Sequence, residues 1–197
     1  MSETATTTTT TDPEAIVETR RGEFVISTDR ARLDLDVIHG FLTNCYWAKG
    51  IPREIVQRSI EHSLCFGVYA DSGREIPLLA KEARSGAPLR GGTPPRSGAP
   101  INSGAPKSKQ IGFARVVSDY ATVAYLGDVF VLESHRGRGL SKWLMECVMQ
   151  HPALQNLRRW ILLTRDAHAL YSKYGFMPVR APERYMELHR PNVYDGT

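Results

Sequence analysis

The clearest pattern in the chain is a change of hydrophobic period between residues 129 and 150. Four consecutive apolar residues, 129–132, predict a buried strand by their length and their β-branched and aromatic content. After a polar bend and a short Arg-Gly loop, apolar residues recur at the spacing of one helix face, namely Leu140, Trp143, Leu144, Cys147 and Val148. Pro152 ends this pattern, because proline cannot continue a helix.

The remaining chain alternates between strand-like and helix-like periods. We expect strands at residues 23–27, 64–69, 110–117, 119–132, 160–163 and 185–188. We expect helices at residues 35–46, 52–61 and 167–174, the last ended by Gly175 at a left-handed cap. The order β-α-α-β-β-β-α-β-α-β predicts an α/β or α+β fold with a mixed sheet.

Two compositionally biased stretches lie outside this pattern. Residues 1–21 are Thr-rich and polar, so we expect a disordered tail. Residues 81–109 contain Ser-Gly-Ala-Pro three times, which predicts a flexible low-complexity insertion at the tip of a β-hairpin. We therefore expect a single domain over residues 22–190 that carries this insertion, with a short C-terminal tail at 191–197.

Composition narrows the classes of protein. With 197 residues, 42% hydrophobic and 23% charged, the chain has the length and balance of one ordinary globular domain. It contains no apolar run of ~18 residues and no signal-peptide pattern, so we expect a cytoplasmic protein without membrane contact. The net charge of +4 comes without a Lys/Arg run of nucleic-acid-binding length. The three cysteines lack metal-ligand spacing, so we expect no metal site.

Between the buried strand and the helix lies the loop Arg136-Gly137-Arg138-Gly139. The first turn of a helix has unpaired N–H groups and a partial positive charge, and glycine lets a ligand approach them closely. The two arginines add full positive charge, so the loop predicts a site for a phosphate or pyrophosphate. It lacks the pattern of a P-loop or of a dinucleotide fingerprint. A solvated basic turn is the alternative interpretation.

Two motifs resemble one known family. The spacing Arg136-x-x-Gly139-x-Ser141 resembles the R/Q-x-x-G-x-G/A loop of the GNAT N-acetyltransferase superfamily, although Ser141 replaces the usual Gly or Ala. The block from Asp166 to Phe176 resembles the N-x-x-A-x-x-L-Y-x-x-x-G-F helix of that family, with Asp166 in place of Asn. The resemblance implies a GNAT-like mixed, mostly antiparallel twisted sheet with helices on both faces.

The resemblance also implies a function. It implies transfer of an acetyl group from acetyl-coenzyme A (acetyl-CoA) to a primary amine of a small molecule or peptide, directly within a ternary complex. The cofactor-binding residues would be Phe130, Val131, Arg136, Gly137, Arg138, Gly139, Leu140 and Ser141. Tyr171 would be the general acid, because a phenol can protonate the leaving thiolate. The alternative role for Tyr171 is packing of its helix on the sheet.

The acceptor side is less specified by the sequence. Asp128 interrupts apolar residues of the central strand, so it is a candidate to orient the acceptor amine or to take its proton through water. The alternative is a carboxylate at a bulge, paired with an arginine. Asn44, Tyr46 and Trp47 are candidates to line the acceptor pocket, or else they pack between the helices.

The expected partners are acetyl-CoA and an amine acceptor, with no nucleic acid and no membrane. The sequence leaves the oligomeric state open, and a homodimer is possible since dimers are common among such folds. The alternative function is a non-catalytic module of the same fold that binds coenzyme A (CoA). The sequence does not name the acceptor.

Overall fold

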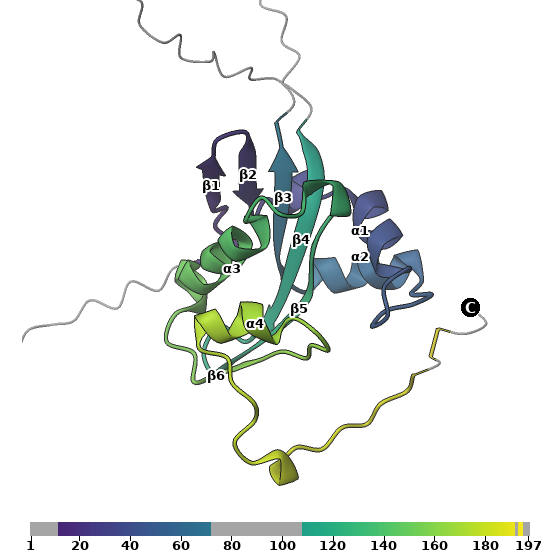
Figure 1. The fold of residues 1–197 in the computed structure, drawn as a ribbon, viewed down its shortest axis with the longest axis vertical. Helices are drawn as coiled ribbons and strands as arrows, with labels where there is room; N and C mark the ends of the chain where they lie inside the picture. Colours follow the sequence, from purple (N-terminus) through teal and green to yellow (C-terminus); the bar gives the residue numbers. More distant parts are fainter. Residues whose placement is uncertain (1–11, 72–107, 192, 195–197) are drawn as a thin grey trace, which may run out of the picture.

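The computed structural model describes residues 12–71, 108–191 and 193–194 (Figure 1). In these residues six strands form one sheet, ordered as they occur in the chain. The strands are β1 (Glu18–Arg21), β2 (Phe24–Ser27), β3 (Leu64–Ala70), β4 (Lys109–Ser118), β5 (Val123–Val131) and β6 (Arg159–Ile161). Neighbours from β1 to β5 are antiparallel, whereas β5 and β6 are parallel. The predicted mixed, mostly antiparallel sheet is thus confirmed.

Helices cover both faces of the sheet (Figure 1). They are α1 (Leu35–Leu42), α2 (Arg53–Glu61), α3 (Leu140–Gln150) and α4 (His168–Tyr171), with short 3-10 turns at Arg30–Arg32, Glu133–His135, Pro152–Leu154, Ser172–Tyr174 and Pro182–Arg184. Successive strand residues face opposite sides, so Cys65 belongs to the core under α1 and α2 while Phe66 belongs to the core under α3. The sheet therefore separates two apolar cores. None of the helices in the described residues is both long and apolar enough to cross a membrane.

Helix α1 is shorter than predicted. The Asp34 side chain caps its start by accepting hydrogen bonds from the N–H groups of Asp36 and Val37 at 3.0 and 3.1 Å. The helix ends at Leu42 rather than at residue 46, and the Asn44 amide donates to the carbonyl of Gly40 at 2.8 Å. This local bond competes with continuation of the helix. Residues 43–52 thus connect α1 to α2.

The two ends of the sheet differ from the prediction. Strand β1 lies within residues 1–21, which were expected to be a disordered tail, and it pairs with β2 from Glu18 opposite Ser27 to Arg21 opposite Phe24. Its four side chains are all exposed, so it carries no apolar alternation that could have indicated a strand.

The strand predicted at residues 185–188 does not form. This segment leaves the sheet (Figure 1), and the Met186 side chain is 99% exposed. Its apolar composition predicted a strand, but a strand also requires a neighbour to pair its N–H and C=O groups. The predicted insertion at 81–109 lies outside the described residues except for Ser108 and Lys109.

Candidate active site

The last part of β5 has one open edge. Strand β5 pairs with β4 as far as Val131, but its pairing with β6 covers only residues 123–125. In Figure 1, β6 accordingly lies beside the lower end of β5 only. Phe130 and Val131 belong to the unpaired part, and their side chains are buried in the two cores. Any contact of these two residues with a ligand along this edge would therefore be made by backbone groups, and the Val131 carbonyl already accepts a hydrogen bond from Arg136.

The Arg-Gly loop has the conformation that the sequence predicts. Gly137 and Gly139 have φ values of 78° and 76°, in the left-handed region that other residues adopt only at a cost of ~1–2 kcal/mol. Gly139 is the N-cap of α3, where no side chain caps the helix and no acidic residue occupies the first turn. Among the described residues, the first N–H groups of α3 therefore have no side-chain partner, and the neighbouring backbone lacks side-chain bulk.

Two guanidinium groups flank this helix start. The Arg136 Nε donates to the carbonyl of Val131 at 3.3 Å, and one Nη lies 4.0 Å from the Glu133 carboxylate. Arg138 donates to the Glu23 carboxylate at 3.2 Å, and each of these two side chains is 50% exposed. The loop arginines are thus held near the helix start while staying accessible.

The next two predicted cofactor residues differ in exposure. The Leu140 side chain is buried in the core under α3, so it can contribute only its backbone N–H to a ligand. Ser141 is partly exposed in the first turn of α3. Its hydroxyl is small enough to leave access to the backbone.

Asp128 lies at a β-bulge. Phe130 pairs with Phe113 but Gly127 pairs with Arg115, so β5 has one residue more than β4 between these pairs. Asp128 has a φ of 55°, and its carboxylate, 13% exposed, accepts hydrogen bonds from Arg115 Nε at 2.6 Å and Trp47 Nε1 at 3.3 Å. The bulge paired with an arginine, one of the two predicted alternatives, is therefore present.

Trp47 of the α1–α2 connection reaches this carboxylate, and Tyr46 packs against Trp47. The Tyr46 and Trp47 rings are perpendicular at 4.9 Å, and both are about half exposed. The Tyr46 hydroxyl accepts a hydrogen bond from the N–H of Arg165, whose guanidinium lies 3.8 Å from the centre of the Tyr46 ring. Asn44 is not part of this group, since its amide bonds locally to α1.

Tyr171 is in α4, close enough to Tyr46, Tyr125 and Asp166 for an electrostatic effect. Burial, with a smaller contribution from these neighbours, raises the pKa of the Tyr171 phenol to about 12. The phenol therefore keeps its proton at neutral pH. Tyr174, three residues later, instead donates its hydroxyl hydrogen to the carbonyl of Lys142 at 2.7 Å and so ties its turn to α3.

Comparison with known proteins identifies the family. A family model described as an acetyltransferase (GNAT) domain matches residues 104–178. A Gibberella zeae protein provisionally named an acetyltransferase is 31% identical over 158 residues, which are 78% of each chain. The chain belongs to the GNAT acetyltransferase family. The match to the family model includes the open edge of β5, the Arg-Gly loop and Tyr171.

Solved structures of proteins described as acetyltransferases share this fold. A Xanthomonas campestris protein provisionally assigned to the GNAT family is 44% identical, with a TM-score of 0.68 over 87% of this chain and 96% of its own. A Clostridium acetobutylicum protein, assigned by prediction as an acetyltransferase, was solved with acetyl-CoA. It is 12% identical to this chain, with a TM-score of 0.50 over 84% of this chain and 94% of its own. The second likeness concerns the fold alone.

Three side chains of this GNAT domain were not among the predicted site residues. Arg115 binds Asp128, Tyr125 lies near both Asp128 and Tyr171, and Arg165 packs on Tyr46. Arg115 had a sequence signal, because a charged residue interrupts the apolar strand 110–117. Tyr125 and Arg165 had none, since their roles depend on the packing of distant segments.

Proposed function

We propose that this protein is an N-acetyltransferase that moves the acetyl group of acetyl-CoA to a primary amine of a small molecule or peptide. The observation that carries the proposal is the start of α3, where uncapped N–H groups, two left-handed glycines and two arginines lie together. This arrangement fits a diphosphate. The presence of acetyl-CoA in the Clostridium structure supports the choice of that diphosphate ligand.

The Arg-Gly loop and β5 would bind different parts of the cosubstrate. The N–H groups of Leu140 and Ser141, with the charges of Arg136 and Arg138, fit the diphosphate. The edge of β5 at Phe130 and Val131, which β6 does not cover, fits the amide groups of the pantetheine arm, which would pair as an added strand does once Arg136 turns from the Val131 carbonyl to the diphosphate.

Tyr171 is assigned as the general acid. In the transfer, the amine nitrogen forms a bond to the acetyl carbon and the bond from that carbon to sulfur breaks. The thiolate that leaves takes the proton of the Tyr171 phenol, and the attacking nitrogen loses a proton to water. The phenolate then regains a proton from solvent. A phenol with a pKa of about 12 carries that proton throughout the neutral range.

We assign Asp128 the role of orienting the acceptor amine. Its carboxylate is already held by Arg115 and Trp47, so its orientation is fixed by two donors. A fixed carboxylate beside the Tyr46 and Trp47 rings suits a positively charged amine, which is attracted both by the charge and by the ring faces. Asp128 therefore orients the amine, which gives up its ammonium proton to water before the nitrogen attacks the acetyl carbon.

The test is release of free CoA thiol from acetyl-CoA with a panel of amines, polyamines, amino acids and peptides. At least one amine should give turnover, and Tyr171→Phe should lower that turnover more than the affinity for CoA. Tyr174→Phe is the matched control, because it removes a hydroxyl that, within the part of the chain that the structure describes, bonds to the α3 backbone. CoA binding without thiol release from any amine would favour a non-catalytic CoA-binding module instead.

A further inference from the structure

Four aromatic residues and one carboxylate form a closed series of neighbours beside the proposed transfer site. Tyr125, the last residue of β5 that pairs with β6, is close enough to Asp128 and Tyr171 for an electrostatic effect. Asp128 accepts a hydrogen bond from Trp47, whose ring is perpendicular to the Tyr46 ring at 4.9 Å. Tyr46 is in turn close to Tyr171, which closes the series. We call these five residues the aromatic cluster.

The polar ends of two rings in the aromatic cluster are already bonded. The Trp47 Nε1 donates to Asp128 at 3.3 Å, and the Tyr46 hydroxyl accepts the N–H of Arg165 at 3.3 Å. The two residues are nevertheless 44% and 49% exposed. What they still offer to a ligand is therefore mainly aromatic surface.

Tyr125 adds a third exposed ring, on the face of the sheet that carries α1 and α2. Its neighbours Ala124 and Leu126 belong to the core under α3, so the Tyr125 side chain lies on the opposite face. Tyr125 is 37% exposed, and a Cβ at Gly127 would come within 3.1 Å of its ring. The missing side chain at Gly127 thus gives the ring room beside Asp128.

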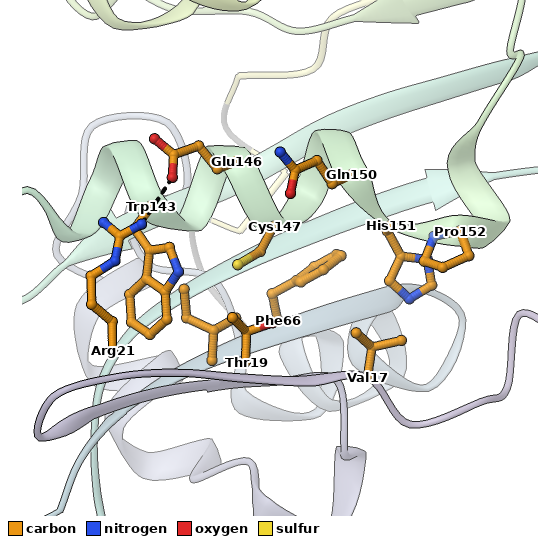
Figure 2. Close-up of a pocket in the computed structure, with 11 residues that line it drawn as sticks. Val17, Thr19, Arg21, Phe66, Trp143, Glu146, Cys147, Gln150, His151 and Pro152 are labelled. Atoms are coloured by element: carbon orange, nitrogen blue, oxygen red, sulfur yellow. Dashed lines mark hydrogen bonds and ion pairs between the residues drawn. The ribbon is translucent and has the colours of Figure 1, made fainter.

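The pocket between α3 and strands β1 to β3 offers less aromatic surface. Figure 2 shows the Phe66 and Trp143 rings that line it, and these residues are only 1% and 3% exposed. Arg21 and Glu146 at this pocket pair with each other at 3.1 Å. Accessible aromatic rings are thus a feature of the aromatic cluster rather than of this pocket.

The arginines at the aromatic cluster already have acidic partners. Arg115 donates to Asp128 at 2.6 Å. The Arg165 guanidinium lies 3.8 Å from the centre of the Tyr46 ring and 3.7 Å from the Asp166 carboxylate. A carboxylate on the acceptor would have to compete with these partners. The cluster therefore favours an acceptor whose one charged group is its amine.

Two uncharged polar side chains close in sequence to the aromatic cluster bond locally. The Asn44 amide donates to the carbonyl of Gly40 at 2.8 Å, and the Thr164 hydroxyl accepts the N–H of Ala167 at 3.0 Å. An acceptor with many hydroxyl groups, such as an amino sugar, would find these two groups already bonded. Aromatic contact is what the cluster still has to offer.

We infer that the acceptor is an arylalkylamine, in which a short alkyl chain joins a primary amine to an uncharged aromatic ring. The amine lies at Asp128, and the ring of the acceptor packs against the three exposed rings of the aromatic cluster. Aromatic pairs attract each other in edge-to-face or offset-stacked contact beyond the area that they bury. The inference rests on the proposed acetyl transfer and names the class of amine that enters the same site. The products are the N-acetylated arylalkylamine and free CoA.

The test compares four amines with the full chain in the assay of CoA thiol release. They are 2-phenylethylamine, 2-cyclohexylethylamine without the aromatic ring, phenylalanine with an added carboxylate, and glucosamine with hydroxyl groups. Rates are expressed per unprotonated amine. kcat/KM for 2-phenylethylamine should exceed that for the cyclohexyl compound at least about threefold, and those for the other two at least about tenfold.

A variant pair locates the preference at the aromatic cluster. Tyr125→Leu keeps an apolar side chain without the aromatic ring, and should reduce the preference for 2-phenylethylamine over 2-cyclohexylethylamine about threefold. Tyr185→Leu is the matched control, because Tyr185 is 46% exposed and packs on Arg159, outside the cluster. An increase of the melting temperature with CoA shows that each variant is folded. If Tyr125→Leu does not fold, the four amines with the wild-type chain decide the matter.

Three results would overturn the inference. The first is equal or faster reaction of 2-cyclohexylethylamine, and the second is faster reaction of phenylalanine or glucosamine. The third is a preference that Tyr125→Leu leaves unchanged. In each of these cases an amine still releases CoA thiol, so the proposed acetyl transfer stands. Thiol release from none of the amines in either panel would overturn both proposals.

Discussion

Glu23 should weaken the binding of CoA. Its carboxylate lies at the turn between β1 and β2 and is hydrogen-bonded to Arg138 at 3.2 Å. In the proposed complex the diphosphate needs the same guanidinium and must approach the same carboxylate. Glu23→Gln removes the negative charge and keeps the shape of the side chain, so we expect tighter binding of CoA.

The size of the effect follows from exposure and distance. Both side chains of the pair are 50% exposed, so the pair itself contributes only ~0–1 kcal/mol. A carboxylate roughly 8 Å from a dianionic diphosphate repels it by about 1 kcal/mol at the dielectric constant of water. Screening at 0.1 M salt reduces this repulsion to about half. The two contributions together predict a gain of ~1 kcal/mol, or about fivefold in affinity.

The assay is a calorimetric titration with CoA at 0.1 M and 1 M salt. The gain should nearly vanish at 1 M salt, where the screening length falls to ~3 Å. Glu146→Gln is the matched control, because Glu146 is paired with Arg21 at 3.1 Å in an equally exposed position further along α3. The reasoning is refuted if Glu23→Gln binds CoA no more tightly than the wild type, or if Glu146→Gln gives the same gain.

Three further predictions concern activity and stability. Asp128→Asn should reduce kcat/KM for the amine on the order of 100-fold through misplacement of the acceptor, with CoA affinity unchanged in a titration; an unchanged kcat/KM would remove its role. Leu144→Ala should lower the free energy of unfolding in urea by about 2–5 kcal/mol, because Leu144 is fully buried, whereas Met186→Ala should change it by less than ~0.5 kcal/mol. The raised pKa of Tyr171, about 12, adds stability that is present below pH ~10 and is lost as the pH rises toward 12. Urea unfolding from pH 9 to 12 should therefore show a smaller loss for Tyr171→Phe, and equal losses would contradict the assignment.

The parts that the sequence predicts well are those in which local pattern and tertiary packing agree. The apolar run, the two glycines and the helix period predict the strand, loop and start of α3, because each depends on residues close together in the chain. Gly175 ends the helical segment of Tyr171 with a φ of 85°, as its position predicts. These local signals are also the ones that carry the two family motifs.

The predictions that proved wrong or stayed open concern segments whose structure depends on residues distant in sequence. Strand β1 has no apolar face and exists because β2 folds back to pair with it. The segment 185–188 has the composition of a strand but pairs with no strand among the described residues. The contacts of Asp128 with Arg115 and Trp47 join three separate segments, so the sequence left its two alternatives open. The acceptor, the homodimer and the cytoplasmic location stay predictions.

A crystal structure with bound CoA tests the central claim most directly. The account predicts that the diphosphate contacts the N–H groups of the first turn of α3 together with Arg136 and Arg138, and that the thiol faces the Tyr171 phenol. A diphosphate bound away from this turn, or a thiol on the opposite side of β5 from Tyr171, would contradict it.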